Sequence, residues 1–502
     1  MPLRWNRSVA VTALLFLFVV SVLLALPRGR HSNDKVLPHM RRPELPFPTS
    51  NKTCGADHAI LVGLHTTPDI EYRRRCIRVV PSENIQRTSL QNESRHLFPK
   101  HVERYNLTNI KATDCRLVLP SCQGRLNLQV PVQVTEDAVD TSTLLFGAAT
   151  SLERLNLTLI QMSRWLGNTH TRLVVVVSHP GREKQFPPVE SHAASLGIDV
   201  TLVSNTPPKE GLDSEIGQAS QHFAISRALY EHRSESHRWF VVIEDDTFFP
   251  SLPVLAQTLS SYDPAIPWYL GALSEDERSV KSSGNMAYGG AGIILSLPVL
   301  ETLERHYNAC MTTTTPGDAL YRDCIYRYSS PTVQFTRLPG LHQLDMKGGD
   351  LSGFYESGLN PLLSIHHYNS YHVFLVHYAH IIADIAGSKS FLQRYLFGDD
   401  AILTNGYSIA QYPFGVADID LNLVEQTFDV VEGQEHMFDS SLGHLRPKLQ
   451  VGLEKNSWIL AYTFTTDEGN VRQFYVKRAN NWGVLNGAEP KPDSVFELDW
   501  SR

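Results

Sequence analysis

Three adjacent acidic residues form the strongest chemical signal in this sequence. Glu244, Asp245 and Asp246 directly follow residues 239–243, an apolar run that predicts a buried strand. Neighbouring carboxylates repel one another, and burying them is unfavourable unless a cation compensates for their charge. Mg²⁺ and Mn²⁺ prefer oxygen ligands and can share them with a diphosphate. The acids therefore predict a metal–nucleotide site, and a solvated acidic turn is the simpler alternative.

A glycine-rich segment follows further along the chain. In "AYGGAGIILSLPVL", residues 287–300, Gly289, Gly290 and Gly292 precede an apolar strand and a helix. Glycine allows a positive φ and a close approach of the backbone to a ligand. Taken alone, the segment is equally compatible with a tight turn.

Alternating strands and helices surround these two segments. Strands are predicted at 143–149, 172–178, 199–204 and 239–243, with helices at 151–166 and about 214–232. Apolar β-branched runs between helices are typical of an α/β fold with a mostly parallel sheet that helices cover on both faces. Ligands of such sheets bind at the carboxyl ends of the strands, where residues 244–246 lie.

Together, "WFVVIEDDTFF" and "YGGAGIILS" resemble the Fringe and core-1 β1,3-galactosyltransferase family of inverting glycosyltransferases (glycosyltransferase family 31), fungal-type branch. The resemblance covers about residues 143–370. The glycine motif matches the family's Gly-Gly-Ala-Gly, whereas Glu244 replaces the first residue of its Asp-Asp-Asp motif. The resemblance implies a GT-A-like (Rossmann-like) fold, a UDP-sugar donor, and Mn²⁺ or another divalent cation.

The resemblance also assigns the metal ligands and the base. Asp246 takes the place of the family's metal-binding acid, and His366 in "LLSIHHYNS" takes that of its metal-binding histidine. Asp318 in "TTPGDALYRDC" takes the place of the general base that deprotonates the acceptor hydroxyl. Asp323 is a nearby rival for that role, and a helix N-cap is the structural alternative for Asp318.

The remaining matched positions concern the donor and the acceptor. The donor-binding residues implied by the resemblance are Glu244, Asp245, Thr150, Arg154, Gly289, Gly290, Ala291 and Gly292. Arg154 could instead be an ordinary arginine on a helix surface. Residues 269–275 and 341–349 are expected to line the acceptor cleft, and His367 either packs or binds the acceptor.

The N-terminus predicts a membrane anchor. Residues 8–26 carry no charge, and a helix of this length spans roughly 30 Å of hydrocarbon, so an uncleaved signal anchor is favoured over a cleaved signal peptide. Glycosylation sequons begin at Asn51, Asn92, Asn106 and Asn156, all after this span. Because sequons are used on the lumenal side, we expect a single-pass type II protein of the Golgi membrane.

The predicted organisation has five sections. They are a cytosolic tail at 1–7, the anchor at 8–26, a lumenal stem at 27–140, a glycosyltransferase domain at 141–399 and a β-rich appendage at 400–502. A small folded subdomain within the stem is an alternative. In the appendage, residues 457–466 and 471–479 alternate apolar and polar side chains around "DEGN", which predicts a β-hairpin.

The six cysteines are compatible with disulfides in a lumenal chain, although the sequence does not determine their pairing. Cys310 and Cys324 bracket the base segment, so a bond between them would fix it. Cys115 and Cys122 bracket another short loop, which would leave Cys54 and Cys76. Six reduced cysteines are the alternative.

The expected function is inverting transfer of a sugar from a UDP-sugar to a hydroxyl of a glycan or glycoprotein, giving a β1,3 linkage. A net charge of −7 argues against nucleic acid as a partner. One alternative is a catalytically inactive lumenal protein that binds a nucleotide or glycan. Another is a glycoside hydrolase that uses two of Asp245, Asp246 and Asp318. The sequence does not predict the donor sugar or the oligomeric state.

Overall fold

The computed structural model describes residues 56–109, 119–122, 124–133, 139–178, 181–204, 215–312, 315, 317–358, 361–434, 436–479 and 491–502. The predicted tail, the predicted anchor and the sequon at Asn51 lie outside these residues. Among the residues described, no helix combines the length and the apolarity that a membrane span requires.

A seven-stranded sheet carries the acidic motif at one of its strand ends. Its strands, in spatial order, are β7 (Asp199–Ser204), β6 (Arg172–Val177), β5 (Leu144–Thr150), β8 (Trp239–Ile243), β10 (Ile293–Ser296), β9 (Tyr269–Gly271) and β11 (Phe335–Arg337). Strands β5 to β8 run parallel, whereas β10 runs antiparallel to both β8 and β9. The sheet is therefore mixed, with four of its six strand pairings parallel and β10 as the strand that runs against the others; an apolar run in the sequence encodes a strand but not its direction.

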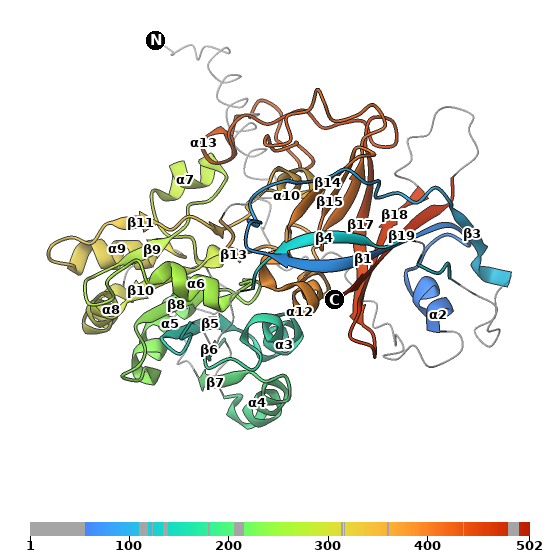
Figure 1. Ribbon diagram of the computed structural model, residues 1–502. Helices are drawn as coiled ribbons and strands as arrows, with labels where there is room; N and C mark the ends of the chain where they lie inside the picture. Colours follow the sequence, from blue (N-terminus) through green and yellow to red (C-terminus); the bar gives the residue numbers. More distant parts are fainter. Residues whose placement is uncertain are drawn as a thin grey trace, which may run out of the picture. The chain divides into compact units, whose positions relative to one another are not determined.

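Helices cover both faces of this sheet (Figure 1). Alternate residues of β5 point to opposite sides: Phe146 packs in one core and Leu145 in another. The first core includes residues of α3 (Leu152–Leu166), α4 (Phe186–Ser195) and α6 (Leu252–Leu259). The second includes residues of α5 (Glu215–His232), α8 (Leu297–Cys310) and α9 (Ala319–Tyr328). This arrangement buries β8 on both faces and brings its end, with the three acids, to one edge of the sheet.

A second sheet has ten strands from both ends of the described chain. Its early strands are β1 (Asp69–Ser82), β2 (Gln91–Glu93), β3 (Glu103–Asn106) and β4 (Leu126–Pro131). Its late strands are β14 (Arg394–Phe397), β15 (Ala401–Thr404), β16 (Ser408–Gln411), β17 (Asn456–Thr465), β18 (Val471–Lys477) and β19 (Asp493–Ser501).

Strands β17 and β18 form the hairpin that the sequence predicts. Strand β1 pairs in parallel with β19, so blue and red strands lie side by side in Figure 1. The section assigned to a stem and the section assigned to an appendage therefore build one sheet together. Pairing between residues more than four hundred positions apart leaves no local sequence pattern, which is why sequence analysis separated them.

Shorter elements complete the described chain. They are α2 (Ala56–Gly63), α7 (Glu277–Ser283), β12 (Leu341–His342), α10 (Ser352–Ser357), β13 (Ser364–Ile365), α11 (Val376–Ala379), α12 (Ala383–Ala386), α13 (Asp439–Leu442) and the 3₁₀ turns η1 (Leu107–Asn109), η3 (Glu183–Gln185), η4 (Gly289–Ala291), η5 (His380–Ile382) and η6 (Ser388–Ser390). Strands β12 and β13 pair in parallel and lie close to the acidic motif in the site described below.

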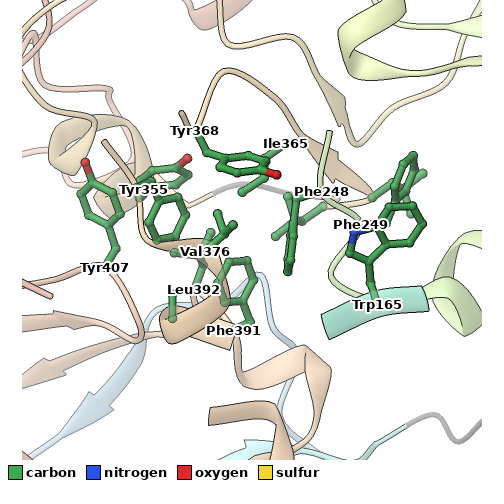
Figure 2. Close-up of a cluster of buried hydrophobic side chains, with 14 of the residues drawn as sticks. Trp165, Phe248, Phe249, Tyr355, Ile365, Tyr368, Val376, Phe391, Leu392 and Tyr407 are labelled. Atoms are coloured by element: carbon green, nitrogen blue, oxygen red, sulfur yellow. The ribbon is translucent and has the colours of Figure 1, made fainter. Parts of the chain in front are cut away.

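The two aromatic residues after the acids anchor the end of β8 on both sides. Figure 2 shows Phe249 beside Trp165 of α3, with ring centroids 5.2 Å apart. Phe248 instead packs against Tyr368 and Phe391, which lie outside the seven-stranded sheet. Both phenylalanines are fully buried. The loop that carries the acids is thus held between the core of the sheet and the segments that lead to β14.

Two disulfides join described segments, Cys76 to Cys122 and Cys310 to Cys324. The first excludes both the Cys115–Cys122 and the Cys54–Cys76 pairings, since the fold brings Cys122 to β1 with a Cα–Cα distance of 5.6 Å. The second joins the end of α8 to α9, beside the segment of Asp318. The sequon asparagines Asn92 and Asn156 are exposed, and Asn106 is half-buried.

The Cys310–Cys324 bond gives a testable contribution to stability. Replacement of both cysteines by serine should lower the free energy of unfolding by about 3 kcal/mol, because the bond closes a short loop in the unfolded chain. Urea denaturation of the variant and the wild type measures this difference. The same comparison in reductant serves as the control, since the remaining difference should shrink there. A loss below about 0.5 kcal/mol in oxidising buffer would contradict the expectation.

Candidate active site

A two-residue β-bridge brings the acids to the histidine. The backbone N–H of Phe248 donates to the carbonyl of Ile365 at 2.9 Å, and the N–H of Ile365 donates back at 2.9 Å. Asp246 lies two residues before this bridge and His366 one residue after it. As a result, Nε2 of His366 lies 3.0 Å from Oδ1 of Asp246. The structure therefore joins the two residues that the sequence assigns to a metal.

The orientation of the His366 ring fits a cation. Its Nδ1 lies 3.2 Å from the carbonyl oxygen of Gln343, which can only accept, so Nδ1 carries the hydrogen. The lone pair of Nε2 then faces Asp246 at 3.0 Å and Glu244 at 3.4 Å. Among the residues described, the buried Nε2 has no hydrogen-bond partner. Three acceptors that face one another repel unless a proton on Nε2 or a metal ion lies between them, so this donor set suits a divalent cation when the imidazole is neutral.

The electrostatics of the pair agree with this geometry. Burial alone would raise the pKa of the Asp246 carboxyl, but the neighbouring imidazole of His366 outweighs it and holds that pKa below its ordinary value. Burial likewise disfavours the charged imidazole, yet Asp246 and Glu244 raise the pKa of His366 well above its usual value. Each group thus favours a positive charge at the position between them.

His367 belongs to the same cluster but is held by other contacts. Asp246, His366 and His367 each offer a ligand atom, and these atoms lie within 4.8 Å of one another. Nδ1 of His367 lies 2.7 Å from the hydroxyl of Ser370, and its Nε2 lies 3.1 Å from Oδ1 of Asp345. Its φ of +56° is rare for a residue other than glycine. These contacts fix His367 beside the metal pair rather than leave a nitrogen free to bind the ion.

Asp245 has a different environment from Asp246. The Thr150 hydroxyl donates to its carboxylate, and Nε of Arg154 donates to the same oxygen at 2.7 Å. A second Arg154 nitrogen donates to the other oxygen, so the arginine binds both carboxylate oxygens. Arg154 lies in the first turn of α3, where Ser151 caps the helix by accepting from the Arg154 N–H. The structure therefore brings together three residues predicted to bind the donor, and Arg154 is not an unengaged surface arginine.

The glycine motif lets two side chains approach the backbone. A Cβ on Gly290 would lie 2.1 Å from Cε1 of His366, and one on Gly289 would lie 2.5 Å from Oδ1 of Asp318. Gly292 has a φ of +111°, which only glycine adopts easily. The predicted close approach is thus seen here with side chains of the protein itself. Contact of this motif with a donor stays a prediction.

Two polar residues whose contacts sequence analysis did not predict link the glycine motif to the acids and to His366. The Thr247 hydroxyl accepts from the Glu244 N–H at 3.1 Å and donates to the Gly290 carbonyl at 2.8 Å. The side chain of Gln343 accepts from the Ala291 N–H at 2.7 Å, while its backbone carbonyl holds His366. Thr247 stands next to the acids in sequence, but no local pattern marks Gln343.

Asp318 faces the site from the start of α9. Its Oδ2 accepts from the Gly289 N–H at 2.7 Å, and its side chain makes no capping bond to α9. Asp318 thus stands at the N-cap position of α9, but its carboxylate does not cap the helix. Burial raises the pKa of Asp318 above its ordinary value, while nearby His222 acts in the opposite direction. By contrast, Asp323 accepts from Arg322 at 2.7 Å and from Thr315 at 3.1 Å, so its carboxylate is already engaged.

The C-terminal section supports the side of the site predicted to hold the acceptor. The Ser441 hydroxyl donates to the Glu275 carbonyl at 2.7 Å, and the Asp429 N–H donates to the Lys347 carbonyl at 2.9 Å. The buried Glu275 side chain accepts from the N–H of Asp345 at 3.1 Å. Burial, with the nearby Asp345 charge, raises the pKa of Glu275 to about 7. The section from 425 to 442 therefore fixes the segments around 275 and 345.

Comparison with known proteins gives similarities over part of the chain. A family described as "Protein of unknown function, DUF604" matches residues 278–385, which include the glycine motif, Asp318 and His366 but not the acids at 244–246. A mouse (Mus musculus) beta-1,3-glucosyltransferase is 28% identical over 135 residues, which make up 26% of this chain and 26% of that protein. The chain thus matches about a quarter of the length of this relative.

Solved structures give weaker similarities. A mannosyltransferase from Pyrobaculum calidifontis, in complex with GDP-Man and Mn²⁺, is 14% identical with a TM-score of 0.28, covering 41% of this chain and 58% of its own. The galactosyltransferase LgtC, in complex with donor and acceptor sugar analogs, is 13% identical with a TM-score of 0.26, covering 38% and 73%. These scores are too low to carry an inference for this chain.

The close contact at Gly290 predicts the effect of a single methyl group. Gly290→Ala should displace the His366 ring and weaken Mn²⁺ binding about 10- to 100-fold, as loss of ligand orientation does elsewhere. The free Mn²⁺ signal in electron paramagnetic resonance measures this affinity without any need for substrate. Asp199→Ala, at the exposed start of β7 and away from the site, is the control. Wild-type affinity in Gly290→Ala would contradict the proposed ligand geometry.

Proposed function

We propose that this chain is a metal-dependent inverting glycosyltransferase that moves a sugar from a UDP-sugar to an acceptor hydroxyl. The acceptor would be a glycan or glycoprotein, and the linkage β1,3. Two observations support this choice. The acidic and glycine motifs resemble those of glycosyltransferase family 31, and 135 residues are similar to a beta-1,3-glucosyltransferase. We further propose that it is a single-pass type II Golgi membrane protein, since disulfides are typical of the secretory pathway.

One observation carries the proposal. A buried histidine nitrogen with no hydrogen-bond partner in the described part of the chain faces Asp246 and Glu244, and the glycine turn that packs on this histidine also binds Asp318. Cation ligands and a carboxylate base thus flank one short segment, 289–291. A binding protein has no need of such a base. A hydrolase would use two carboxylates; because Arg154 and Thr150 engage Asp245, that alternative is left with Asp246 and Asp318.

The residues divide the reaction between them. The hydroxyl oxygen of the acceptor attacks C1 of the donor sugar, and its proton passes to the carboxylate of Asp318. The bond between C1 and the β-phosphate oxygen breaks, so UDP leaves with the bonding electron pair. Asp246 and His366 would hold the divalent cation, with Glu244 beside it. When bound, that cation offsets the negative charge that develops on the leaving diphosphate.

Loss of the metal ligand should abolish transfer. With the purified full-length chain and a panel of UDP-sugars, we expect UDP release from one donor in Mn²⁺, and none in EDTA. Asp246→Ala should lower this release at least about 100-fold, because uncompensated charge on the leaving group raises the barrier. Asp199→Ala is the control, since Asp199 lies at the start of β7 and pairs with the exposed Arg172. Full activity in Asp246→Ala would disprove the assigned ligand.

The same assay separates the alternative functions. Binding of UDP and Mn²⁺ with no turnover across donors and acceptors would favour a catalytically inactive binding protein with this fold. Cleavage of a glycan without nucleotide or metal would favour a hydrolase.

The role proposed for Asp318 predicts that its substitution lowers kcat and that the activity of the wild type depends on pH. Asp318→Asn should lower kcat by about 10²- to 10⁴-fold with UDP binding unchanged, because an amide cannot accept the proton. In the wild type, activity should be lost as pH falls through the raised pKa of Asp318, at a pH above the ordinary value of 3.8. A profile of kcat/KM against pH tests this loss of activity at low pH. Asp323→Asn should retain the wild-type rate and profile, and the reverse result would make Asp323 the base.

A further inference from the structure

A histidine of helix α5 contacts the carboxylate of Asp318. Nδ1 of His222 lies 3.3 Å from Oδ1 of Asp318, while the other oxygen, Oδ2, accepts from the Gly289 N–H. The two side chains are similarly enclosed, with 15% of His222 and 16% of Asp318 exposed. His222 lies near the middle of α5, far from any residue that the sequence marked, and the proposed reaction has so far given it no role.

The surroundings fix the position of the His222 ring. Its edge packs against the ring of Tyr321 with centroids 5.5 Å apart, and the Tyr321 hydroxyl donates to the His222 carbonyl at 2.8 Å. A Cβ on Gly289 would lie 2.8 Å from Cε1 of His222, so the glycine turn closes on the same ring. The imidazole is thus held by α9 on one side and by the glycine motif on the other.

The hydrogen of the imidazole is best placed on Nδ1. Nδ1 faces a carboxylate, which can accept it, whereas the buried Nε2 has no hydrogen-bond partner among the described residues. A hydrogen on Nε2 would leave a buried donor unpaired, which costs about 1–3 kcal/mol. With the hydrogen on Nδ1, His222 faces Oδ1 of Asp318 at 3.3 Å, while the Gly289 N–H donates to Oδ2. The carboxylate plane is then fixed from both sides.

We propose that His222 is a positioning residue that, together with the Gly289 N–H, orients the Asp318 carboxylate toward the acceptor hydroxyl. This inference rests on the proposed transferase function and adds a residue to it. A carboxylate that is free to rotate spends less time aligned with the hydroxyl, so the loss of His222 lowers the rate of the chemical step. Donor affinity should not change, because His222 contacts neither cation ligand, Asp246 or His366, in the contacts described.

A double-mutant cycle tests this role. His222→Ala should lower kcat about tenfold with the KM for the donor unchanged, and Asp318→Asn should lower kcat further. If His222 acts only through Asp318, the double variant should match Asp318→Asn within about twofold, since residues that act as a unit are not additive. Multiplied losses in the double variant, or a wild-type kcat in His222→Ala, would overturn the inference.

Conservative variants separate positioning from packing. Asn can place an amide N–H near the position of Nδ1, so His222→Asn should retain most of kcat, whereas His222→Gln should not. His232→Ala, at the end of the same helix, is the matched control for effects on α5 and should leave kcat unchanged. A loss in His222→Asn equal to that in His222→Ala would overturn the role assigned to Nδ1.

The outcomes distinguish this inference from the function on which it rests. If the wild type transfers no sugar from any donor, the proposed function fails and the role of His222 fails with it. If the wild type transfers sugar and Asp318→Asn does not, but His222→Ala is fully active, only the role of His222 fails. Mn²⁺ and UDP binding in each variant shows that it is folded.

Discussion

The site depends on one electrostatic constraint: the carboxylates of Asp246 and Glu244 and Nε2 of His366 converge on one point, where a proton on the imidazole or a bound cation must supply a positive charge. The neighbouring Asp245 differs, because Arg154 and Thr150 donate hydrogen bonds to its carboxylate. Of two adjacent acids, Asp245 is thus neutralised by an arginine of the protein, and Asp246 is the one proposed to bind an ion. Repulsion among the remaining acceptors would separate them unless the backbone held them together.

The fold supplies that restraint through rigid, mostly backbone contacts. The bridge between Phe248 and Ile365 fixes the distance between the acids and His366, and the burial of Phe248 and Phe249 prevents the loop from moving away. Glycine at 290 removes the side chain that would otherwise displace the imidazole. Because a packed core deforms very little, such contacts can keep groups that repel one another close together at a modest cost in stability. The ten-stranded sheet adds to this through the C-terminal section, which holds the segments around 275 and 345.

The sequence predicts those parts of this arrangement that local patterns encode. Apolar runs predict β5, β6, β7 and β8, and the rule that ligands bind at strand ends places Thr150 and Asp246 at one edge. The contacts of Gln343 and His222 could not be predicted, because Gln343 joins distant segments through its side chain and its backbone, and His222 lies within an ordinary helical pattern. The antiparallel direction of β10 and the pairing of β1 with β19 also depend on contacts between distant segments. Sequence patterns thus locate the reactive groups but not the residues that orient them.

The glutamate at position 244 can be understood in the same terms. Its side chain is 44% exposed, so the extra methylene meets open space rather than the core. Its Oε2 still reaches to 3.4 Å from Nε2 of His366, and the Thr247 hydroxyl holds its backbone N–H as a fixed starting point. The longer side chain on this fixed backbone keeps its carboxylate beside His366 but loses more rotamer entropy when it is held there. The departure from three aspartates therefore changes how tightly the first acid is held, while Asp246, His366 and Asp318 keep the contacts that the proposed chemistry requires.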